Sequence, residues 1–357
     1  MTSPRRSSWW GLSRTQTIIA LGSAVVIGIV MALLLPRSGK PPPVAATSAV
    51  WVFGFATVRA DPALRHAEIV HTVGFGAVAG ATGRVYLYDP GTGRLGYLDA
   101  AHNQLHELPR APHGSSVPGV ATPLVAVGSR RVWLVPSPDR LVEYDTSSRR
   151  VERTIPLPTA HGVPRRTAVV ATGRRVIAVS ESSDRVTLTQ VDRRRGVVTR
   201  TRDLPGSHVD PQLLGVAGTD QLLWTVTPGS AMAIDPATLR VHTTMALAAN
   251  DASAGGAAAA GTHCYVLRSN SGVVSLSPSG DERVVVDLQH PADAPPTPAA
   301  IAVGDGRVYA LVPVGSGPDD HRSRLTGARL PSGADTRSVQ LPASLFAGGL
   351  ALSSASP

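Results

Sequence analysis

Val132-Trp133-Leu134 is one of seven copies of a short pattern that recurs along this 357-residue chain. Each copy places a large side chain between smaller, mostly apolar residues, and in most copies a Gly-containing turn comes before it. A repeat of about 40–50 residues made only of short strand-like runs is typical of a β-propeller. The large residues lie 35 to 47 positions apart, at Trp51, Tyr86, Trp133, Ile177, Trp224, Tyr265 and Tyr309.

The repeat predicts an all-β domain built from four-stranded antiparallel blades, each beginning with its innermost strand. Runs rich in Ala, Gly and Val come before the large residues, and small side chains suit a crowded central channel. Six complete blades can be counted between Gly74 and Leu341, whereas residues 49–73 lack an innermost strand. The segment Leu345–Leu352 has the composition of that missing strand. We therefore expect a seven-bladed propeller whose C-terminal strand closes blade 1, with six blades as the alternative, because closure removes exposed sheet edges.

A second marker recurs later in the repeat, where an aspartate starts a polar turn. Asp99, Asp145, Asp192 and Asp235 lie 43 to 47 residues apart, and each stands ahead of an apolar run. The carboxylate of such an aspartate can accept a hydrogen bond from its own following backbone. The structure of the turn alone therefore explains why aspartate occurs at these four positions, without a functional role.

The phrase from Tyr144 to Pro156, YDTSSRRVERTIP, resembles the repeat of YVTN-type and quinoprotein-like propellers. The layout of an apolar segment followed by a propeller is similar to membrane-anchored actinobacterial proteins. The resemblance covers residues 49–353 and implies a fold but no particular function. The residues that hold pyrroloquinoline in some quinoprotein propellers have no counterpart that can be placed here, so no cofactor is predicted.

An uncharged apolar segment of 19 residues runs from Thr17 to Leu35. As a helix it would be about 28 Å long, enough to cross the hydrocarbon core of a membrane. Arg5, Arg6 and Arg14 come before it and favour a cytoplasmic N-terminus. The predicted organisation is a cytoplasmic basic tail (1–16), a transmembrane helix (17–35), a Pro-rich linker (36–48) and an extracytoplasmic propeller (49–357). A cleaved signal peptide is the alternative, although its apolar core would be shorter.

The net charge of +9 is unevenly distributed along the chain. Residues 1–40 contribute +5 and residues 165–205 contribute +6, so the rest of the chain sums to about −2. Nucleic-acid binding is disfavoured by this balance and by the expected extracytoplasmic position. Arginines in residues 165–205 are instead candidates for binding an envelope protein or an anionic cell-wall polymer. The candidate partner-binding residues are Arg165, Arg166, Arg193, Arg194 and Arg195.

Catalytic motifs are absent from the sequence: it has no Walker loop, nucleophile elbow, His-Glu-x-x-His or paired-cysteine zinc pattern. The one cysteine, Cys264, lies in a strand pattern and is expected to be a small buried side chain. Polar residues in the connections that leave successive outer strands are candidate ligand-binding residues at the channel mouth, because a ring of imidazoles can bind a metal or an anion. These residues are His113, His161, His208, Asn250, Asp251 and His290.

The sequence thus favours a non-enzymatic scaffold anchored in the cell membrane, which binds a protein or an envelope polymer. The alternative is an extracytoplasmic receptor or enzyme that uses the channel mouth. Chance occurrence of histidine in polar loops and ordinary solvated arginine turns would also explain the two candidate sites.

Overall fold

The computed structural model describes residues 48–54, 56–71, 76–114, 124–128, 130–158, 164–204, 213–247, 252–268, 272–288, 300–313, 323–341 and 349–353. The chain divides into two units, Met1–Ala45 and Ala46–Pro357, and all the described residues belong to the second. The predicted basic tail and transmembrane helix therefore lie outside the described residues, as does the linker up to residue 47. Within the described ranges, no helix is both long and apolar enough to cross a membrane.

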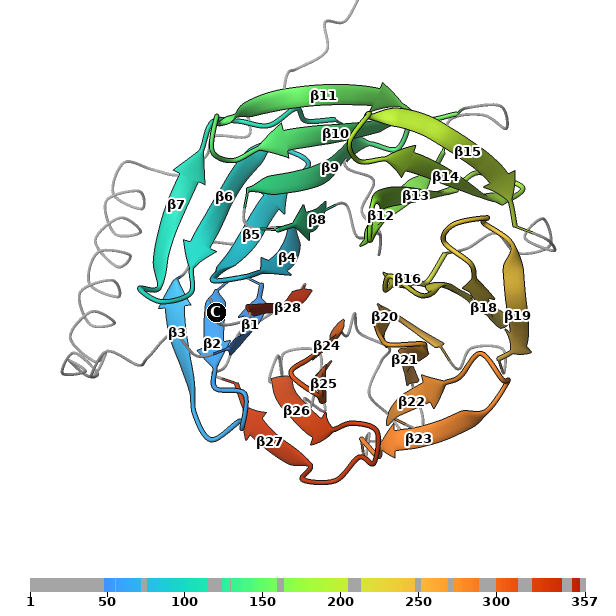
Figure 1. Ribbon diagram of the computed structural model, residues 1–357. Helices are drawn as coiled ribbons and strands as arrows, with labels where there is room; N and C mark the ends of the chain where they lie inside the picture. The colour runs from blue at the N-terminus through green and yellow to red at the C-terminus, as the bar shows by residue number, and fades with distance from the viewer. Residues whose placement is uncertain are drawn as a thin grey trace, which may run out of the picture. The chain divides into compact units, whose positions relative to one another are not determined.

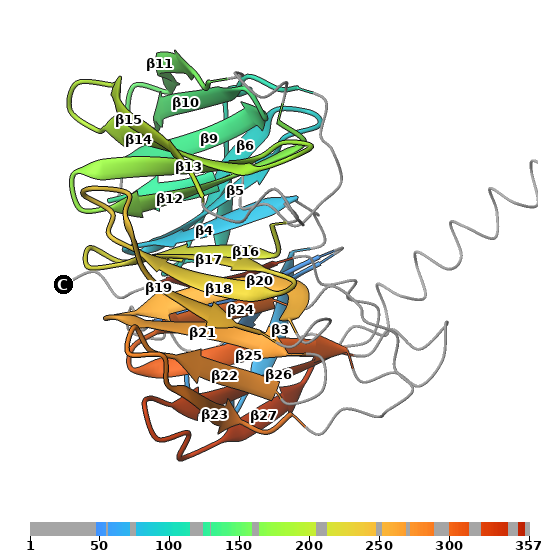
Figure 2. The same ribbon diagram turned by 90° about the vertical axis from the view of Figure 1, so that its right-hand side faces the viewer.

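The second unit is an all-β propeller of seven sheets, each with four antiparallel strands, as Figure 1 shows. Figure 2 turns the ring by 90°, so that its two faces lie at the left and right. From the inner to the outer strand, blade 1 contains β28 (Gly349–Ser353), β1 (Ala49–Phe53), β2 (Thr57–Ala60) and β3 (Ala67–His71); blade 2 contains β4 (Ala77–Ala81), β5 (Arg84–Asp89), β6 (Arg94–Asp99) and β7 (Gln104–Leu108). Blade 3 contains β8 (Leu124–Val127), β9 (Arg131–Ser137), β10 (Arg140–Asp145) and β11 (Arg150–Pro156); blade 4 contains β12 (Arg166–Thr172), β13 (Arg175–Glu181), β14 (Val186–Asp192) and β15 (Val197–Asp203). Blade 5 contains β16 (Gly215–Gly218), β17 (Leu223–Thr227), β18 (Ser230–Ile234) and β19 (Val241–Ala246); blade 6 contains β20 (Ala252–Ala260), β21 (His263–Arg268), β22 (Gly272–Leu276) and β23 (Glu282–Val286); blade 7 contains β24 (Ala300–Gly304), β25 (Arg307–Pro313), β26 (Ser323–Arg329) and β27 (Arg337–Gln340).

Blade 1 is completed by the two ends of the propeller sequence, which confirms the predicted closure. The C-terminal strand β28 pairs along the whole of β1, from Ala49 opposite Ser353 to Phe53 opposite Gly349. The indole Nε1 of Trp51 donates a hydrogen bond of 3.0 Å to the Ser353 hydroxyl. The ring therefore has seven blades, and closure leaves β1 with a partner on both sides.

The large residue of each repeat lies in the second strand of its blade and is buried. Trp51, Trp133 and Trp224 are at most 1% exposed. Apolar side chains from neighbouring blades share one cluster, as where Tyr86 of blade 2 packs with Leu124 and Val132 of blade 3. Blade-to-blade packing therefore accounts for the pattern that recurs along the sequence.

Small residues let the innermost strands of neighbouring blades approach one another closely. A Cβ atom added to Gly80 of β4 would lie 1.8 Å from the carbonyl oxygen of Leu352 in β28. One added to Gly215 of β16 would lie 2.7 Å from the backbone nitrogen of Ala257 in β20. The Ala, Gly and Val content of these strands therefore follows from packing around the axis.

The recurrent aspartates start the turns between the third and fourth strands, as predicted. The carboxylate of Asp192 accepts hydrogen bonds from the backbone N–H groups of Arg194 and Arg195. These bonds to the amides of the following residues, that of Arg195 first, outweigh the opposing effect of desolvation and lower the pKa of Asp192. The equivalent turns of blades 2, 3 and 5 use Asp99, Asp145 and Asp235 in the same way.

These turns also join the blades to one another. In every blade, a side chain makes a hydrogen bond to the turn between strands three and four of the next blade round the ring. The bonds are His71 Nε2 to Asn103 O, Tyr86 Oη with Thr146 Oγ1, Arg153 Nη1 to Arg193 O, Gln190 Nε2 to Pro236 O, Thr243 Oγ1 to Pro278 O, Arg283 Nη2 to Ser332 O and Tyr309 Oη to Pro62 O. The aspartate turns are therefore part of the blade interfaces.

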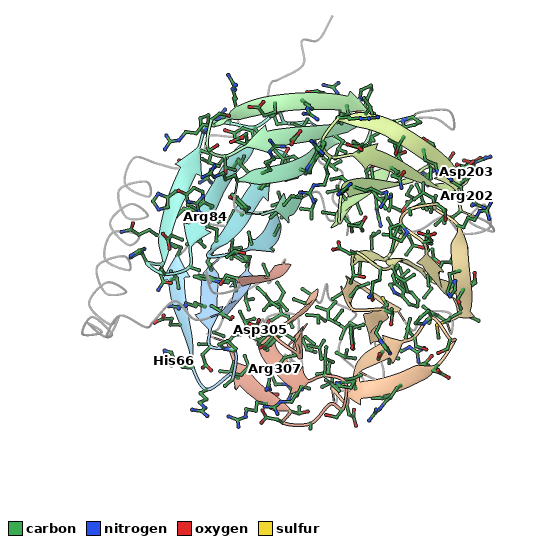
Figure 3. All side chains as sticks on the ribbon, viewed as in Figure 1. His66, Arg84, Arg202, Asp203, Asp305 and Arg307 are labelled. Atoms are coloured by element: carbon green, nitrogen blue, oxygen red, sulfur yellow. The ribbon has the colours of Figure 1, made fainter. Side chains whose placement is uncertain are left out.

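In blade 7 a nearly buried arginine holds the corresponding turn by its aspartate. Arg307, which Figure 3 labels, has a side chain that is 10% exposed. Its guanidinium donates bonds of 2.8 Å to the Asp335 carboxylate and to the Asp335 carbonyl oxygen. Arg337 also bonds this carboxylate, at 2.8 Å. The hydrogen bonds from Arg307 and then Arg337 lower the pKa of Asp335 from 3.8 to about 2.

This shift predicts a pH dependence of stability. Because the pKa is lower in the folded state, the ion pairs stabilise the fold above pH 4, and that contribution is lost as the pH falls through 2. We expect Asp335→Asn to be less stable than the wild type at pH 7, with the gap in melting temperature closing between pH 4 and pH 2. Thermal unfolding of both proteins at pH 7, 4, 3 and 2 measures the gap. A gap that stays constant down to pH 2 would contradict the assignment.

Candidate functional site

The two faces of the ring differ in the connections that they carry. One face, here called the Asp-turn face, carries the turns between strands one and two and those between strands three and four. The other, here called the connection face, carries the turns between strands two and three and the links from one blade to the next. Each candidate residue can be assigned to a face from its place on its strand.

Of the candidate ligand-binding residues at the channel mouth, only His113 is described. It is exposed and lies on the connection face, in the link that follows β7, next to the turn that contains Gly93. His161, His208, Asn250, Asp251 and His290 lie outside the described residues. The described part of the chain contains no group of three or more His, Cys, Asp or Glu side chains that could hold a metal ion. The ring of histidines stays a prediction.

The innermost strands offer little chemistry near the axis. Over β4, β8, β12, β16, β20, β24 and β28, the sequence contains Ala, Gly, Val, Leu, Ile, Ser and Thr, and Arg166 is its one ionisable residue. Cys264 of β21 is buried, as predicted, and desolvation raises the pKa of its thiol. The described strands around the axis therefore present mostly aliphatic side chains.

The candidate partner-binding arginines lie on both faces of blade 4. Arg165 and Arg166 stand at the start of β12 on the connection face, where the Arg165 N–H donates to the Glu181 carbonyl oxygen. Arg193, Arg194 and Arg195 form the turn between β14 and β15 on the Asp-turn face. The five residues therefore lie on two faces of the ring, although they are close together in the sequence.

The structure instead groups Arg193–Arg195 with arginines of blade 3 along the Asp-turn face. Arg174 lies next to this group because its carbonyl oxygen accepts a hydrogen bond from the Arg193 N–H. In blade 3 the Thr146 N–H bonds the Arg130 carbonyl oxygen in the same way. We call this surface the arginine rim; its members are Arg130, Arg131, Arg149, Arg150, Arg153, Arg174, Arg193, Arg194 and Arg195.

A buried carboxylate anchors the inner side of the arginine rim. The Glu143 side chain is 1% exposed and bonds Arg131 at 2.9 Å, while the Arg153 guanidinium lies 3.5 Å from its other oxygen. Arg153 also donates a hydrogen bond to the Arg193 carbonyl oxygen, across the boundary between blades 3 and 4. Partial burial, followed by the nearby charge of Arg131, lowers the pKa of Arg193. The hydrogen bond from Arg153 to Arg193 therefore links the two blades beside the buried carboxylate.

The outer side of the rim carries charge that the described residues do not neutralise by ion pairing. Arg130, Arg149, Arg174, Arg194 and Arg195 are exposed. None of their guanidinium groups lies within 4.0 Å of a carboxylate of the described residues. Exposed guanidinium groups bind carboxylates and phosphates through bidentate hydrogen bonds.

Exposed apolar side chains accompany these arginines. Val151 follows Arg150 directly and is 37% exposed, and Val197 and Val198 follow the Arg193–Gly196 turn with exposed fractions of 47% and 40%. Three of the five exposed large apolar residues in the described part of the chain therefore border the rim. A surface that combines arginine with aliphatic groups fits a protein partner better than a strongly hydrated polymer.

The blade 3 members of the arginine rim were not among the candidates selected from the sequence, although the sequence contains a signal for two of them. Arg130 and Arg131 lie 44 residues before Arg174 and Arg175, the same spacing as between Trp133 and Ile177. Aligning basic residues by their place in the repeat, rather than by closeness along the chain, would have found them.

Comparisons with known proteins agree with the propeller fold and assign no function. No family model matches the sequence, and no curated protein matches it. Among solved structures, the chain is similar to the computationally designed Ika8 protein, with 11% identity, a TM-score of 0.50 and coverage of 84% of this chain and 87% of that one. It is also similar to BamB from Moraxella catarrhalis (12% identity, TM-score 0.45, coverage 86% and 95%) and to a chain of a nidogen/laminin complex (13% identity, TM-score 0.44, coverage 66% and 91%). At these identities the likeness shows the fold alone, and that fold is a seven-bladed β-propeller.

Proposed function

We propose that this chain is a non-enzymatic interaction module, a propeller held outside the cell membrane that scaffolds an acidic partner of the cell envelope through its arginine rim. The observation that carries the proposal is the rim itself, in which two neighbouring blades place exposed arginines, not ion-paired with any described carboxylate, beside exposed valines on one face. Such a surface attracts an acidic partner and orients it.

The aliphatic character of the innermost strands supports a binding role over a catalytic one. General acid–base or nucleophilic chemistry needs positioned ionisable side chains. The described innermost strands supply one such side chain, Arg166, and the Cys264 thiol is buried.

The membrane anchor is the second part of the proposal. It is supported by the 19 uncharged residues from Thr17 to Leu35, with Arg5, Arg6 and Arg14 on the N-terminal side. The resemblance of the repeat to membrane-anchored YVTN-like and quinoprotein-like propellers of actinobacteria points to the same placement. Protease treatment of intact spheroplasts should digest the propeller and leave the membrane-bound N-terminus. A propeller that resists protease until the cells are broken would refute an extracytoplasmic position.

Crosslinking in living cells tests the scaffold itself. The full-length chain is captured after crosslinking, together with a variant that carries Arg149→Glu, Arg194→Glu and Arg195→Glu. Arg193 is kept because its guanidinium hydrogen-bonds the Gly173 carbonyl oxygen. A stoichiometric envelope protein that is captured with the wild type and lost with the variant is the expected result.

The matched control reverses the charge of two exposed arginines on the connection face, with Arg140→Glu and Arg165→Glu. This control variant should capture the same partner as the wild type. Equal capture by both variants would show that the arginine rim is not the binding surface. A chain that captures no protein under any condition would refute the scaffold and favour a small ligand on the connection face, where His113 lies.

A further inference from the structure

Three neighbouring strands of blade 3 direct charged side chains toward blade 4. Glu143 of β10 lies opposite Trp133 of β9 and opposite Arg153 of β11, so these three side chains leave the same face of the sheet. Arg131 stands two residues before Trp133 and therefore shares that face. The Trp133 side chain packs with apolar residues of blade 4. The buried Glu143 carboxylate and its two arginines therefore lie at the boundary between the two blades.

Blade 4 adds a third guanidinium group at this boundary. Arg193 accepts a hydrogen bond from Arg153 at its carbonyl oxygen, and its own guanidinium donates to the Gly173 carbonyl oxygen. Burial lowers the pKa of Arg193, and the charge of Arg131 lowers it further, against the opposite effect of Glu143. The Arg193 side chain is therefore close to the charges of blade 3. We call Arg131, Glu143, Arg153 and Arg193 the inner arginine site.

The inner arginine site has more positive charge and more donors than its own contacts use. Its three arginines and one glutamate sum to +2. Asp220, whose charge also acts on Arg193, makes no ion pair with it among the described residues. Each guanidinium has five N–H donors, and the described hydrogen bonds occupy one nitrogen on each of the three. The side chains of Arg131 and Arg153 are 49% and 34% exposed, so a ligand can reach the remaining donors.

A link between two blades does not require this arrangement. At the boundary of blades 4 and 5, Gln190 stands where Glu143 stands in blade 3, opposite the outer-strand residue Arg200. Gln190 and Arg200 both donate hydrogen bonds to carbonyl oxygens of the next turn. That link uses no carboxylate and brings no second arginine into contact among the described residues. The three guanidinium groups at the boundary of blades 3 and 4 therefore have a purpose beyond joining the blades.

We propose that the inner arginine site binds one phosphate monoester group in its dianionic form. A phosphate monoester carries a charge of about −1.5 to −2 at pH 7 and has three acceptor oxygens, so three guanidinium groups can bond it at once. One carboxylate would pair with a single guanidinium fork and would leave the others unmatched. Glu143 is a positioning residue, because it holds Arg131 and Arg153 beside each other in the absence of ligand. The inference goes beyond the proposed scaffold function and does not depend on it.

Equilibrium dialysis with radiolabelled inorganic phosphate tests the site in the full-length protein in detergent. At an ionic strength of about 0.15 M, saturable binding of one phosphate per chain is expected. Glycerol 3-phosphate should displace the label, and acetate at the same concentration should not. Stronger displacement by phosphatidic acid in the micelle would identify a lipid headgroup as the source of the phosphate. Stronger displacement by glycerol 3-phosphate would identify a soluble ester.

A double variant separates a positioned site from diffuse charge. Arg131→Gln with Glu143→Gln removes one charge of each sign, leaves no buried carboxylate without its partner, and places glutamine where blade 4 has Gln190. It should weaken phosphate binding at least about tenfold, because one of the three guanidinium groups is lost. Arg150→Gln with Glu152→Gln is the matched control, since it removes an exposed ion pair of the same blade. This control should bind phosphate like the wild type.

A second variant moves one arginine without changing any charge. A Cβ atom added to Gly196 would lie 2.5 Å from Cδ and Nη1 of Arg153, whose flexible side chain would have to move away. Gly196→Ala should therefore weaken phosphate binding at least about fivefold. Gly280→Ala is the matched control, because Gly280 also has a positive φ in the corresponding turn of blade 6, and an added Cβ would meet nothing within 4 Å. This control should leave phosphate binding unchanged.

Wild-type affinity in both site variants would overturn the proposal. An equal loss of binding in the exposed-pair control would mean that the phosphate responds to the general charge of the arginine rim. Displacement by acetate as effective as that by glycerol 3-phosphate would make a carboxylate the ligand instead. The crosslinking test of the scaffold reverses Arg149, Arg194 and Arg195, and none of these belongs to the inner arginine site. Failure of phosphate binding therefore leaves the scaffold proposal standing, and unchanged capture in cells leaves the phosphate result standing.

Discussion

Removal of residues 349–357 is expected to abolish cooperative folding of the propeller, which makes it the most damaging change in this set. The deletion takes away β28, the innermost strand of blade 1, and exposes β1, in which all five residues are buried. It also removes the Ser353 hydroxyl that accepts a hydrogen bond from the Trp51 indole. The ring opens between blades 1 and 2, where β28 packs against β4. An open apolar edge of this kind pairs with other chains.

Size-exclusion chromatography and thermal unfolding of the full-length and truncated chains measure this effect. The truncated protein should elute as aggregates and show no sharp unfolding transition. A chain that ends at Ser353 is the control and should unfold like the wild type, because it keeps the whole strand. Ser353→Ala is the milder variant and should cost about 1–3 kcal/mol, since it leaves the buried Trp51 N–H without its acceptor. Normal unfolding of the truncated chain would mean that the ring does not depend on β28.

The blade count and the closing strand could be predicted because they depend on periodic burial. A propeller repeat places one large residue in the second strand of each blade, so the position of Trp51 without an inner strand before it required a strand from elsewhere in the chain. The C-terminal strand is Gly349–Ser353, which overlaps the end of the predicted Leu345–Leu352 segment. Alternation and turn chemistry are local properties, and a single sequence shows them.

The candidate surface could be predicted only in part, because charge on a propeller is grouped by face and not by position along the chain. Arg165 and Arg193 are 28 residues apart in one blade, yet they lie at opposite ends of its strands. Arg153 of blade 3 is 40 residues from Arg193 and donates a hydrogen bond to its carbonyl oxygen. Contacts between blades depend on the radial stacking of sheets, which no local pattern records.

Gly80→Ala is expected to destabilise the propeller by at least about 3 kcal/mol, which lowers the melting temperature of a domain of this size by roughly 5 °C. The added Cβ would lie 1.8 Å from the Leu352 carbonyl oxygen, and a backbone atom of a neighbouring strand cannot move aside as a flexible side chain can. The two innermost strands, β4 and β28, would have to separate at the point where the ring is closed. Since β28 is held by β1 along its whole length, that movement would also strain blade 1.

Gly229→Ala is the matched control for this prediction. Gly229 lies in the turn between β17 and β18, and a Cβ added there would meet nothing within 4 Å. The control should unfold within about 0.5 kcal/mol of the wild type, as exposed substitutions usually do. Thermal unfolding of the three full-length proteins under one condition gives the comparison. If Gly80→Ala and Gly229→Ala have the same melting temperature, the close contact between β4 and β28 does not limit stability. The small residues of the innermost strands would then need a reason other than packing around the axis.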